Sequence, residues 1–334
     1  MGCVRYDFQV DSSERVPAPL FGAVAAEAEA AGFRAFWKGE SNGRDPIAVL
    51  AAASQRTSRM LLGTSILNVH ARSPAAAAMA AATLQELSGG RFILGLGVGN
   101  RTIASWHGRE FRSPLRSMEE YVGIVRSALE GARTSHEGSV YRSSGFRLSF
   151  PARPVPIYLA ALGPRMSELA GRIADGSITN LGDAAQMELV WESVRRGEAE
   201  AGRPRGSVEV VDIVRVSVSD DYGRALEAMK ANFAFYGLAD YYGEMFARMG
   251  AGDAVRELRE NYRRYGFRAA ASMVPEDALR KVPGLIAASS VEEARSRIRA
   301  MGNIRADALM VVYVPNSEDP AGEAIRFLRS WSPP

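Results

Sequence analysis

Short apolar runs rich in β-branched residues alternate with helical stretches along most of the chain. Eight of these runs predict strands, namely Val4–Val10, Phe33–Lys38, Met60–Leu67, Arg91–Leu96, Pro156–Ala160, Ser177–Asn180, Val208–Val218 and Ala308–Val314. Alternation of strand and helix is typical of a parallel sheet with helical crossovers. Closure is the natural arrangement for eight such strands, so the predicted fold class is an α/β (β/α)8 TIM barrel. An open, doubly wound sheet is the alternative.

Helix boundaries carry the expected signals, and two segments depart from the repeat. Gly32 follows the predicted helix Leu20–Ala31 as a stop, and Ser73-Pro74 opens another helix with an N-cap and a first-turn proline. The polar alternation of Thr134–Phe150 predicts a hairpin. Residues 237–288 are too long for one crossover and predict a helical insertion after the seventh strand. With no linker-like stretch, we expect one domain over residues 1–334.

Composition narrows the class of protein. The chain has 334 residues, 47% of them hydrophobic, as in ordinary globular proteins. Its net charge of +3 comes from basic residues spread along the sequence, which disfavours a nucleic-acid partner. The single cysteine, Cys3, excludes an intrachain disulfide. No secretory leader pattern and no apolar stretch of about 18 residues is present, so we expect a cytosolic protein with no membrane partner.

One turn has the chemistry of an anion site. Ala160–Met166 follows the fifth predicted strand and opens a helix. Gly163 permits close backbone approach, Pro164 suits a first turn, and the amides of Arg165 and Met166 would face outward at the positive end of the helix dipole. The turn therefore suits a phosphate. Ordinary punctuation by glycine and proline is the alternative.

Other candidate motifs carry less information. Gly95–Asn100 (GLGVGN) has the look of a dinucleotide-binding loop, but we expect no helix to start close behind it. Asp7 lies inside an apolar strand, where burial would raise its pKa and suit it to donate a proton; an ion pair with an arginine is the alternative. Only His70, His107 and His136 are available, and there is no zinc-type spacing, Walker loop or GxSxG elbow, so histidine-based metal or hydrolytic chemistry is disfavoured.

Several blocks, in the right order, resemble one superfamily. Four segments are similar to luciferase-like monooxygenases. They are Leu61–Gly99 (LLGTSILNVHARSPAAAAMAAATLQELSGGRFILGLGVG), Pro156–Gly176 (PIYLAALGPRMSELAGRIADG), the early AGFRAFWKGES and the closing Ala288–Val314. They most resemble methylenetetrahydromethanopterin reductase and its relatives, which use the deazaflavin coenzyme F-420. The resemblance implies a TIM-barrel oxidoreductase that acts on a small molecule.

The resemblance also implies which residues meet the cofactor ring. A β-bulge with a non-prolyl cis peptide at Ser65-Ile66 would press on one face of the ring. Asn68 would hydrogen-bond its pyrimidine edge. Gly97 and Gly99 would belong to the loop that flanks it, although a glycine-rich barrel rim is an equal alternative.

The phosphate and the reaction centre are implied in the same way. The cofactor phosphate would lie on the backbone of Ala161, Leu162, Gly163, Pro164, Arg165 and Met166. Asp7 matches a position where the methanopterin reductases carry a glutamate near the reaction centre.

One departure from the family pattern affects the expected function. Glu40 follows the second strand where many relatives have an Asp-His pair, and here it is followed by Ser41. Glu40 remains a candidate catalytic acid, but the missing histidine leaves the substrate open. The leading hypothesis is hydride transfer between reduced coenzyme F-420 and a small acceptor, which could resemble methylenetetrahydromethanopterin. An FMN-dependent monooxygenase and a non-catalytic flavin-binding homologue are the alternatives.

The alanine-rich helix Pro74–Leu87 bears on assembly. Alanine favours helix and lets a second helix approach closely. In the resembled superfamily, helices of this region often form a dimer interface. We expect a homodimer, or a higher homo-oligomer; packing of this helix on its own barrel is the alternative.

Overall fold

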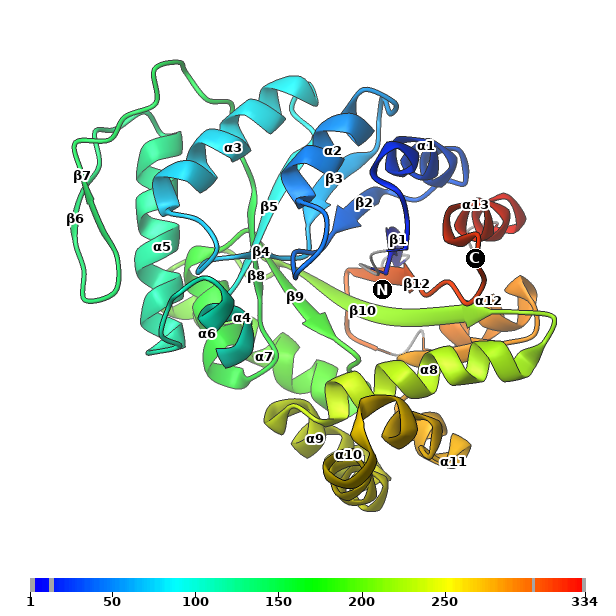
Figure 1. Ribbon diagram of the computed structural model, residues 1–334. Helices are drawn as coiled ribbons and strands as arrows, with labels where there is room; N and C mark the ends of the chain where they lie inside the picture. Colours follow the sequence, from blue (N-terminus) through cyan, green and yellow to red (C-terminus); the bar gives the residue numbers. More distant parts are fainter. Residues whose placement is uncertain (1–3, 12–14, 302–303, 332–334) are drawn as a thin grey trace.

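Eight parallel strands form a closed ring at the centre of the molecule, in a computed structural model that describes residues 4–11, 15–301 and 304–331 (Figure 1). The ring consists of β1 (Arg5–Val10), β2 (Ala35–Lys38), β3 (Leu61–Thr64), β5 (Phe92–Gly97), β8 (Ile157–Ala160), β9 (Gly176–Asn180), β10 (Glu209–Val218) and β12 (Ala308–Tyr313). Pairing of β9 with β10 closes it: Val211 lies opposite Ile178 on one side and Ala308 on the other. The predicted barrel is confirmed, and each predicted strand overlaps one strand of the ring. Cys3 lies outside the described residues.

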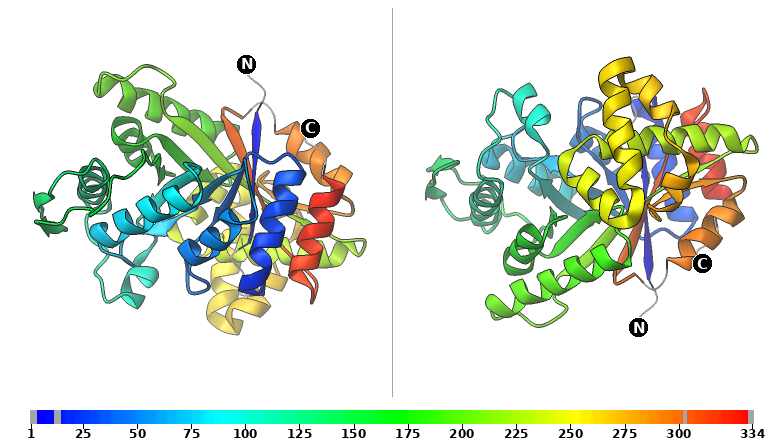
Figure 2. Two further views of the ribbon diagram at one scale, coloured as in Figure 1. Left: turned by 90° about the horizontal axis from the view of Figure 1, so that it is seen from above. Right: turned by 90° about the horizontal axis from the view of Figure 1, so that it is seen from below.

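Helices surround this ring. They are α1 (Phe21–Ala30), α2 (Pro46–Ser54), α3 (Pro74–Leu87), α5 (Pro114–Leu129), α6 (Pro164–Ile173), α7 (Ala184–Glu200), α8 (Tyr222–Gly237) and α13 (Pro320–Ser330), with a 3-10 turn η1 (Ala18–Leu20) before α1. The first and last of them, α1 and α13, lie side by side (Figure 2). Ser73 caps α3 as predicted, since its hydroxyl accepts the Ala76 amide at 3.2 Å. In the described ranges no helix is both long and apolar enough to pass through a bilayer.

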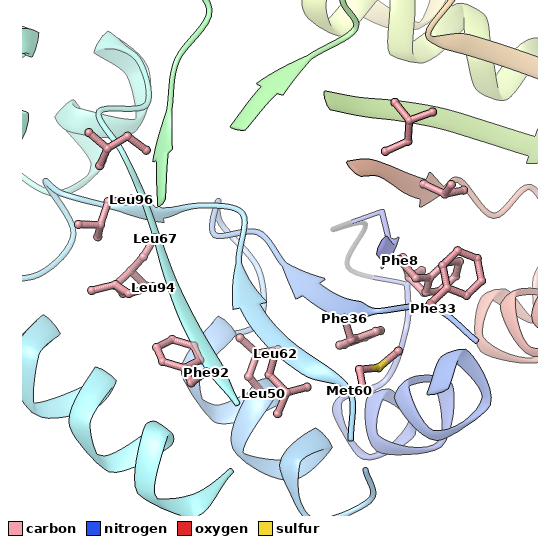
Figure 3. Packing of buried hydrophobic residues seen from close by; sticks show 14 of the residues in the cluster. Phe8, Phe33, Phe36, Leu50, Met60, Leu62, Leu67, Phe92, Leu94 and Leu96 are labelled. Carbon is pink, nitrogen blue, oxygen red and sulfur yellow. The ribbon is translucent and has the colours of Figure 1, made fainter. Parts of the chain in front are cut away.

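The two faces of the strands build two kinds of packing. Side chains that point outward meet the helices, as Figure 3 shows for Phe36, Leu62 and Phe92. Side chains that point inward fill the barrel, and two glycines make room for large rings there. A Cβ on Gly63 would lie 2.3 Å from Trp37, and one on Gly176 would lie 2.5 Å from Tyr158, so these rings occupy the space that side chains would take.

The third predicted strand and the loop after the fourth differ from expectation. Met60–Leu67 is not one strand: β3 ends at Thr64 and a short β4 (Leu67–Asn68) resumes beside β5. The expectation that no helix follows GLGVGN is wrong. Asn100 accepts the Ile103 amide at 3.0 Å and starts α4 (Arg101–Trp106) at once. This helix is short, so its sequence has too little periodicity to reveal it.

The hairpin and the insertion are both present. β6 (Ser135–Glu137) and β7 (Arg142–Ser144) pair antiparallel, which confirms the predicted hairpin. The insertion contains α9 (Asp240–Phe246), a π-helical turn η2 (Ala247–Ala251), α10 (Gly252–Ser272), α11 (Glu276–Arg280) and β11 (Leu285–Ala288). Helix α12 (Val291–Ala300) follows it. Helices α9 to α11 gather beside α8 on one side of the barrel (Figures 1 and 2). The insertion is not wholly helical as predicted, because β11 pairs with the second half of β10 and extends the sheet.

Candidate active site

The barrel has two different mouths because all eight strands run in one direction. In TIM barrels reactive groups gather at the carboxyl ends of the strands, while the opposite mouth serves stability. Glu40 follows β2, Ser65 and Ile66 follow β3, Gly97 ends β5, and the turn of residues 161–166 follows β8. These strands are neighbours in the ring. The structure therefore brings the candidates, Asp7 excepted, to one arc of the carboxyl-end mouth.

The peptide bond between Ser65 and Ile66 is cis, at the position that the resemblance implied. The Ser65 hydroxyl donates to the side-chain oxygen of Gln9, which points inward from β1. Gly97 faces Ile66 across the strands: a Cβ on Gly97 would lie 2.6 Å from Ile66 Cγ1. The absence of a side chain at Gly97 thus lets Ile66 lie flat against the end of β5.

Glu40 holds the loop that follows Ile66 in place through two hydrogen bonds. Its Oε2 accepts the Asn68 amide at 2.7 Å, and its Oε1 accepts Arg72 Nη2 at 3.1 Å. Asn68 Oδ1 in turn accepts the His70 amide at 2.8 Å. Asn68 is 1% exposed, yet its Nδ2 has no partner among the described residues. A buried amide donor without an acceptor is rare in folded proteins and calls for a ligand or water.

Gly99 lies against the side chain of Asn68. Its φ of 58° lies in the left-handed region, and a Cβ there would sit 2.3 Å from Asn68 Nδ2. Glycine is therefore required both by the backbone and by the space around the Asn68 amide. The loop that the sequence left undecided between ring contact and rim lies directly against the unpaired donor.

The turn after β8 has the form of an anion site. Gly163 is the N-cap of α6 and supplies no side-chain cap, while Pro164 and Arg165 are exposed. Helix geometry leaves the amides of Arg165 and Met166 without acceptors in their own helix, and the dipole adds positive potential there. Ala161 is buried and anchors the turn, because its amide donates to Ile178 O at 2.8 Å. Backbone donors thus lie at an exposed turn.

A polar cluster that sequence reasoning missed lies on another arc of the same mouth. Arg215, which points inward from β10, bonds Asp11 Oδ1 at 3.1 Å and the Tyr236 hydroxyl. Asn180 Nδ2 donates to the Tyr242 hydroxyl at 2.8 Å. Burial raises the pKa of both phenols, so they stay protonated and able to donate at neutral pH. The periodicity of β10 places position 215 on the inner face with 211 and 213, and that signal could have pointed to Arg215.

Within this cluster two polar atoms are left over. Arg215 and Asn180 are 6% and 7% exposed, and among the described residues Arg215 Nε and Asn180 Oδ1 have no hydrogen-bond partner. One is a donor and the other an acceptor. Within the ranges that the structure describes, this arc therefore contains one unpaired donor and one unpaired acceptor.

Asp7 lies elsewhere, near the amino-end mouth. Its carboxyl is fully buried and accepts Arg34 Nε at 2.8 Å, Arg34 Nη2 at 2.6 Å and Trp37 Nε1 at 2.9 Å. Burial raises the pKa of Asp7, while the Arg34 guanidinium and the Trp37 N–H oppose that rise. Glu209 bonds the far side of Arg34 and also accepts the Tyr158 hydroxyl. This geometry favours the ion-pair alternative over a proton donor at the reaction centre.

Comparison with known proteins identifies the family of the chain. The family model described as luciferase-like monooxygenase matches residues 4–308. The chain belongs to the luciferase-like monooxygenase family. It is 32% identical over 235 residues, 70% of each chain, to 5,10-methylenetetrahydromethanopterin reductase of Archaeoglobus fulgidus. It is 32% identical over 241 residues to the coenzyme F-420-dependent glucose-6-phosphate dehydrogenase of Nakamurella multipartita, covering 67% of this chain and 70% of that one.

Solved structures agree on the fold. The coenzyme F-420-dependent tetrahydromethanopterin reductase of Methanopyrus kandleri superposes with a TM-score of 0.82 over 99% of both chains, at 22% identity. A coenzyme F-420-dependent secondary alcohol dehydrogenase, solved with an adduct of the coenzyme and acetone, gives 0.76 over 98% of both chains at 21% identity. The protein is an oxidoreductase of this family.

Proposed function

We propose that the protein binds reduced coenzyme F-420 and transfers a hydride between it and a small organic acceptor. The observation that carries this proposal is the buried, unpaired Asn68 Nδ2 beside Gly97 and Gly99, at the same mouth as the open amides of α6. A donor for a ring carbonyl and a turn for a phosphate are the two contacts that a flavin-like cofactor needs. The coenzyme F-420-dependent relative from Nakamurella multipartita supports the deazaflavin form.

The residues present fit such a group. Ser65 and Ile66 would support one face of the ring, and the lack of side chains at Gly97 and Gly99 lets Ile66 and Asn68 lie close against the backbone there. Asn68 Nδ2 would donate to the carbonyl oxygen at the pyrimidine edge. The backbone of residues 161–166 would hold the phosphate. When bound, the reduced deazaflavin supplies the hydride, so the protein's contribution is orientation and electrostatics.

Polar side chains of the protein would contact the hydride acceptor. Tyr236 and Tyr242 stay protonated on the arc formed by β9, β10, α8 and α9, and the unpaired atoms of Asn180 and Arg215 face the same region. Glu40 is occupied by Asn68 and Arg72, so its role here is to hold the ring-binding loop. We propose that the acceptor lies between this arc and the cofactor ring. A molecule similar to methylenetetrahydromethanopterin is one candidate.

Separate titrations with coenzyme F-420 and FMN, followed by fluorescence, test the proposal. We expect coenzyme F-420 to bind at least about tenfold more tightly than FMN. Tight binding of FMN alone would favour a flavin-dependent monooxygenase, for which the phosphate turn would serve equally. Binding of neither would favour a non-catalytic homologue.

An Asn68→Asp variant sharpens that test. It keeps the oxygen that accepts the His70 amide and removes only the Nδ2 donor. We expect the affinity for coenzyme F-420 to fall about tenfold or more, because a buried hydrogen bond is replaced by two facing acceptors. Asn232→Asp is the matched control, since that amide donates only to Ala228 O within α8. Equal affinity of the Asn68→Asp and wild-type proteins would contradict the ring contact.

A further inference from the structure

The carbonyl of Leu162, in the turn after β8, accepts two side-chain hydrogen bonds. Gln186 Nε2, from the first turn of α7, donates to it at 2.7 Å, and the Tyr241 hydroxyl, from α9 of the insertion, also donates at 2.7 Å. Gln186 is itself held in place: it is 5% exposed, and its backbone N–H donates to Asp183 Oδ1 at 2.8 Å. A single carbonyl is thus held from two elements that lie far apart in the sequence.

These two bonds set the direction of the next amide. Among the described residues the only cis bond is Ser65-Ile66, so the bond between Leu162 and Gly163 is trans. The C=O and N–H of a trans peptide point in opposite directions within one plane. With the Leu162 oxygen held toward α7 and α9, the Gly163 N–H must point away from them. It therefore faces the open side of the turn.

Such holding matters because the residue that follows is glycine. Gly163 has no Cβ to resist rotation of the preceding peptide plane, and its φ of −93° and ψ of 157° place no steric lock on it. Without the two donors, the Leu162–Gly163 peptide could rotate and present a carbonyl oxygen where an amide is needed. An oxygen there would repel an anion.

We propose that Gln186 and Tyr241 are positioning residues that orient the Leu162–Gly163 peptide, so that its N–H joins the amides of Arg165 and Met166 in binding the cofactor phosphate. This inference rests on the proposed function and assigns a part of it. Neither residue touches the phosphate. Each acts through the peptide.

The insertion thereby becomes part of the cofactor site. Tyr241 also stands against Gly163, where a Cβ would be 3.5 Å from the ring. The next residue, Tyr242, is bonded to Asn180 at the end of β9, so α9 is fixed at two adjoining points of the mouth. From η2, Arg248 Nη2 reaches Gln186 Oε1 at 3.5 Å. Both donors to Leu162 are therefore linked to the same inserted segment.

The test compares phosphorylated and phosphate-free ligands. Wild type, Tyr241→Phe and Gln186→Leu are titrated with coenzyme F-420 and with its chromophore lacking the phosphate tail. We expect each variant to lose about fivefold to tenfold in affinity for coenzyme F-420, and the double variant more, with affinity for the phosphate-free chromophore unchanged. Tyr222→Phe is the matched control: it removes a tyrosine bond to Glu276 at 3.0 Å, away from the turn, and should change neither affinity.

Other outcomes would overturn the inference. Equal losses for both ligands would show a general structural role, and no loss would show that the peptide keeps its direction unaided. Should wild type bind neither ligand, the proposed function fails, and titration with inorganic phosphate decides the inference by itself. A shift of the Gly163 amide resonance in wild type that disappears in Tyr241→Phe supports it; no shift in wild type refutes it.

Discussion

The two mouths of the barrel contain similar polar residues, which differ in whether their polar atoms have hydrogen-bond partners. At the amino-end mouth, Asp7 and Glu209 both pair with Arg34, and Arg5 gives Glu209 a second positive partner. The Trp37 and Tyr158 donors complete the network. At the carboxyl-end mouth, several buried polar atoms have no partner in the described part of the chain, among them Asn68 Nδ2, Asn180 Oδ1 and Arg215 Nε. A satisfied network serves stability, whereas unpaired atoms at the mouth where TIM barrels hold their reactive groups are candidates for contact with a ligand.

Single strands supply both mouths, which explains why they are so alike in composition. Asp7 and Gln9 are two residues apart on β1 and both lie on its inner face. Glu209 and Arg215 also share the inner face of β10, although they are further apart along it. Only their depth along the barrel separates them. The contrast between the mouths therefore arises from which partners meet each residue, and not from residue type.

The largest expected effect is on the amino-end network. Arg34→Met removes the guanidinium and leaves the Asp7 carboxyl buried without its partner. Breaking a buried ion pair from one side costs about 3–5 kcal/mol. We therefore expect the free energy of unfolding, measured by urea denaturation, to fall by about that amount.

A control variant at the surface and a second variant at Asp7 test whether the effect of Arg34→Met comes from the buried ion pair. Arg329→Met breaks the pair with Glu27 on the surface, for which we expect a loss of about 0–1 kcal/mol. Asp7→Asn should also destabilise the fold. If it instead left stability unchanged and abolished turnover, Asp7 would be catalytic and the division between the mouths would be wrong.

An intermediate effect is expected at the hairpin, where a charge near the carboxyl-end mouth is fully satisfied. Glu120 on α5 accepts the amides of Ser139, Val140 and Tyr141, each at 2.9 Å. Tyr141 then donates its hydroxyl to Val69 O at 2.8 Å, next to Asn68 in the loop proposed to bind the cofactor ring. Burial alone would raise the pKa of Glu120, but the three N–H donors outweigh it and lower the pKa to about 2. Glu120→Gln should cost about 2 kcal/mol at pH 7.

This stabilisation should depend on pH in a known direction. Because the pKa of Glu120 is lower in the folded state, its contribution is present above the ordinary glutamate value of about 4.3. It is lost as the pH falls from there toward about 2. The difference in unfolding free energy between wild type and Glu120→Gln should therefore shrink between pH 5 and pH 3. A constant difference would show that the carboxylate charge is not what holds the hairpin.

The sequence predicted the barrel because eight strands each carry a local pattern, and it predicted the mouth because a strand end is also local. It could not separate Asp7 the acid from Asp7 the ion-pair partner, since Arg34 and Glu209 lie 27 and 202 residues away from it and only folding brings them together. Leu285–Ala288 was assigned to a helical insertion for a related reason: four apolar residues carry too short a period to distinguish strand from helix.

The smallest expected effect on stability is at Gly163, where the effect on binding should be larger. Its φ of −93° suits any residue, and an added Cβ would meet only Tyr241 at an ordinary contact distance of 3.5 Å. Gly163→Val should therefore change the free energy of unfolding by less than about 1 kcal/mol. The branched side chain would crowd Tyr241, one of the two donors proposed to orient the Leu162–Gly163 peptide, so the affinity for coenzyme F-420 should fall at least about tenfold. The affinity for the phosphate-free chromophore should change little. A variant that lost stability and kept its affinity would place Gly163 with the residues that support the fold, and the carboxyl-end mouth would lose its phosphate turn.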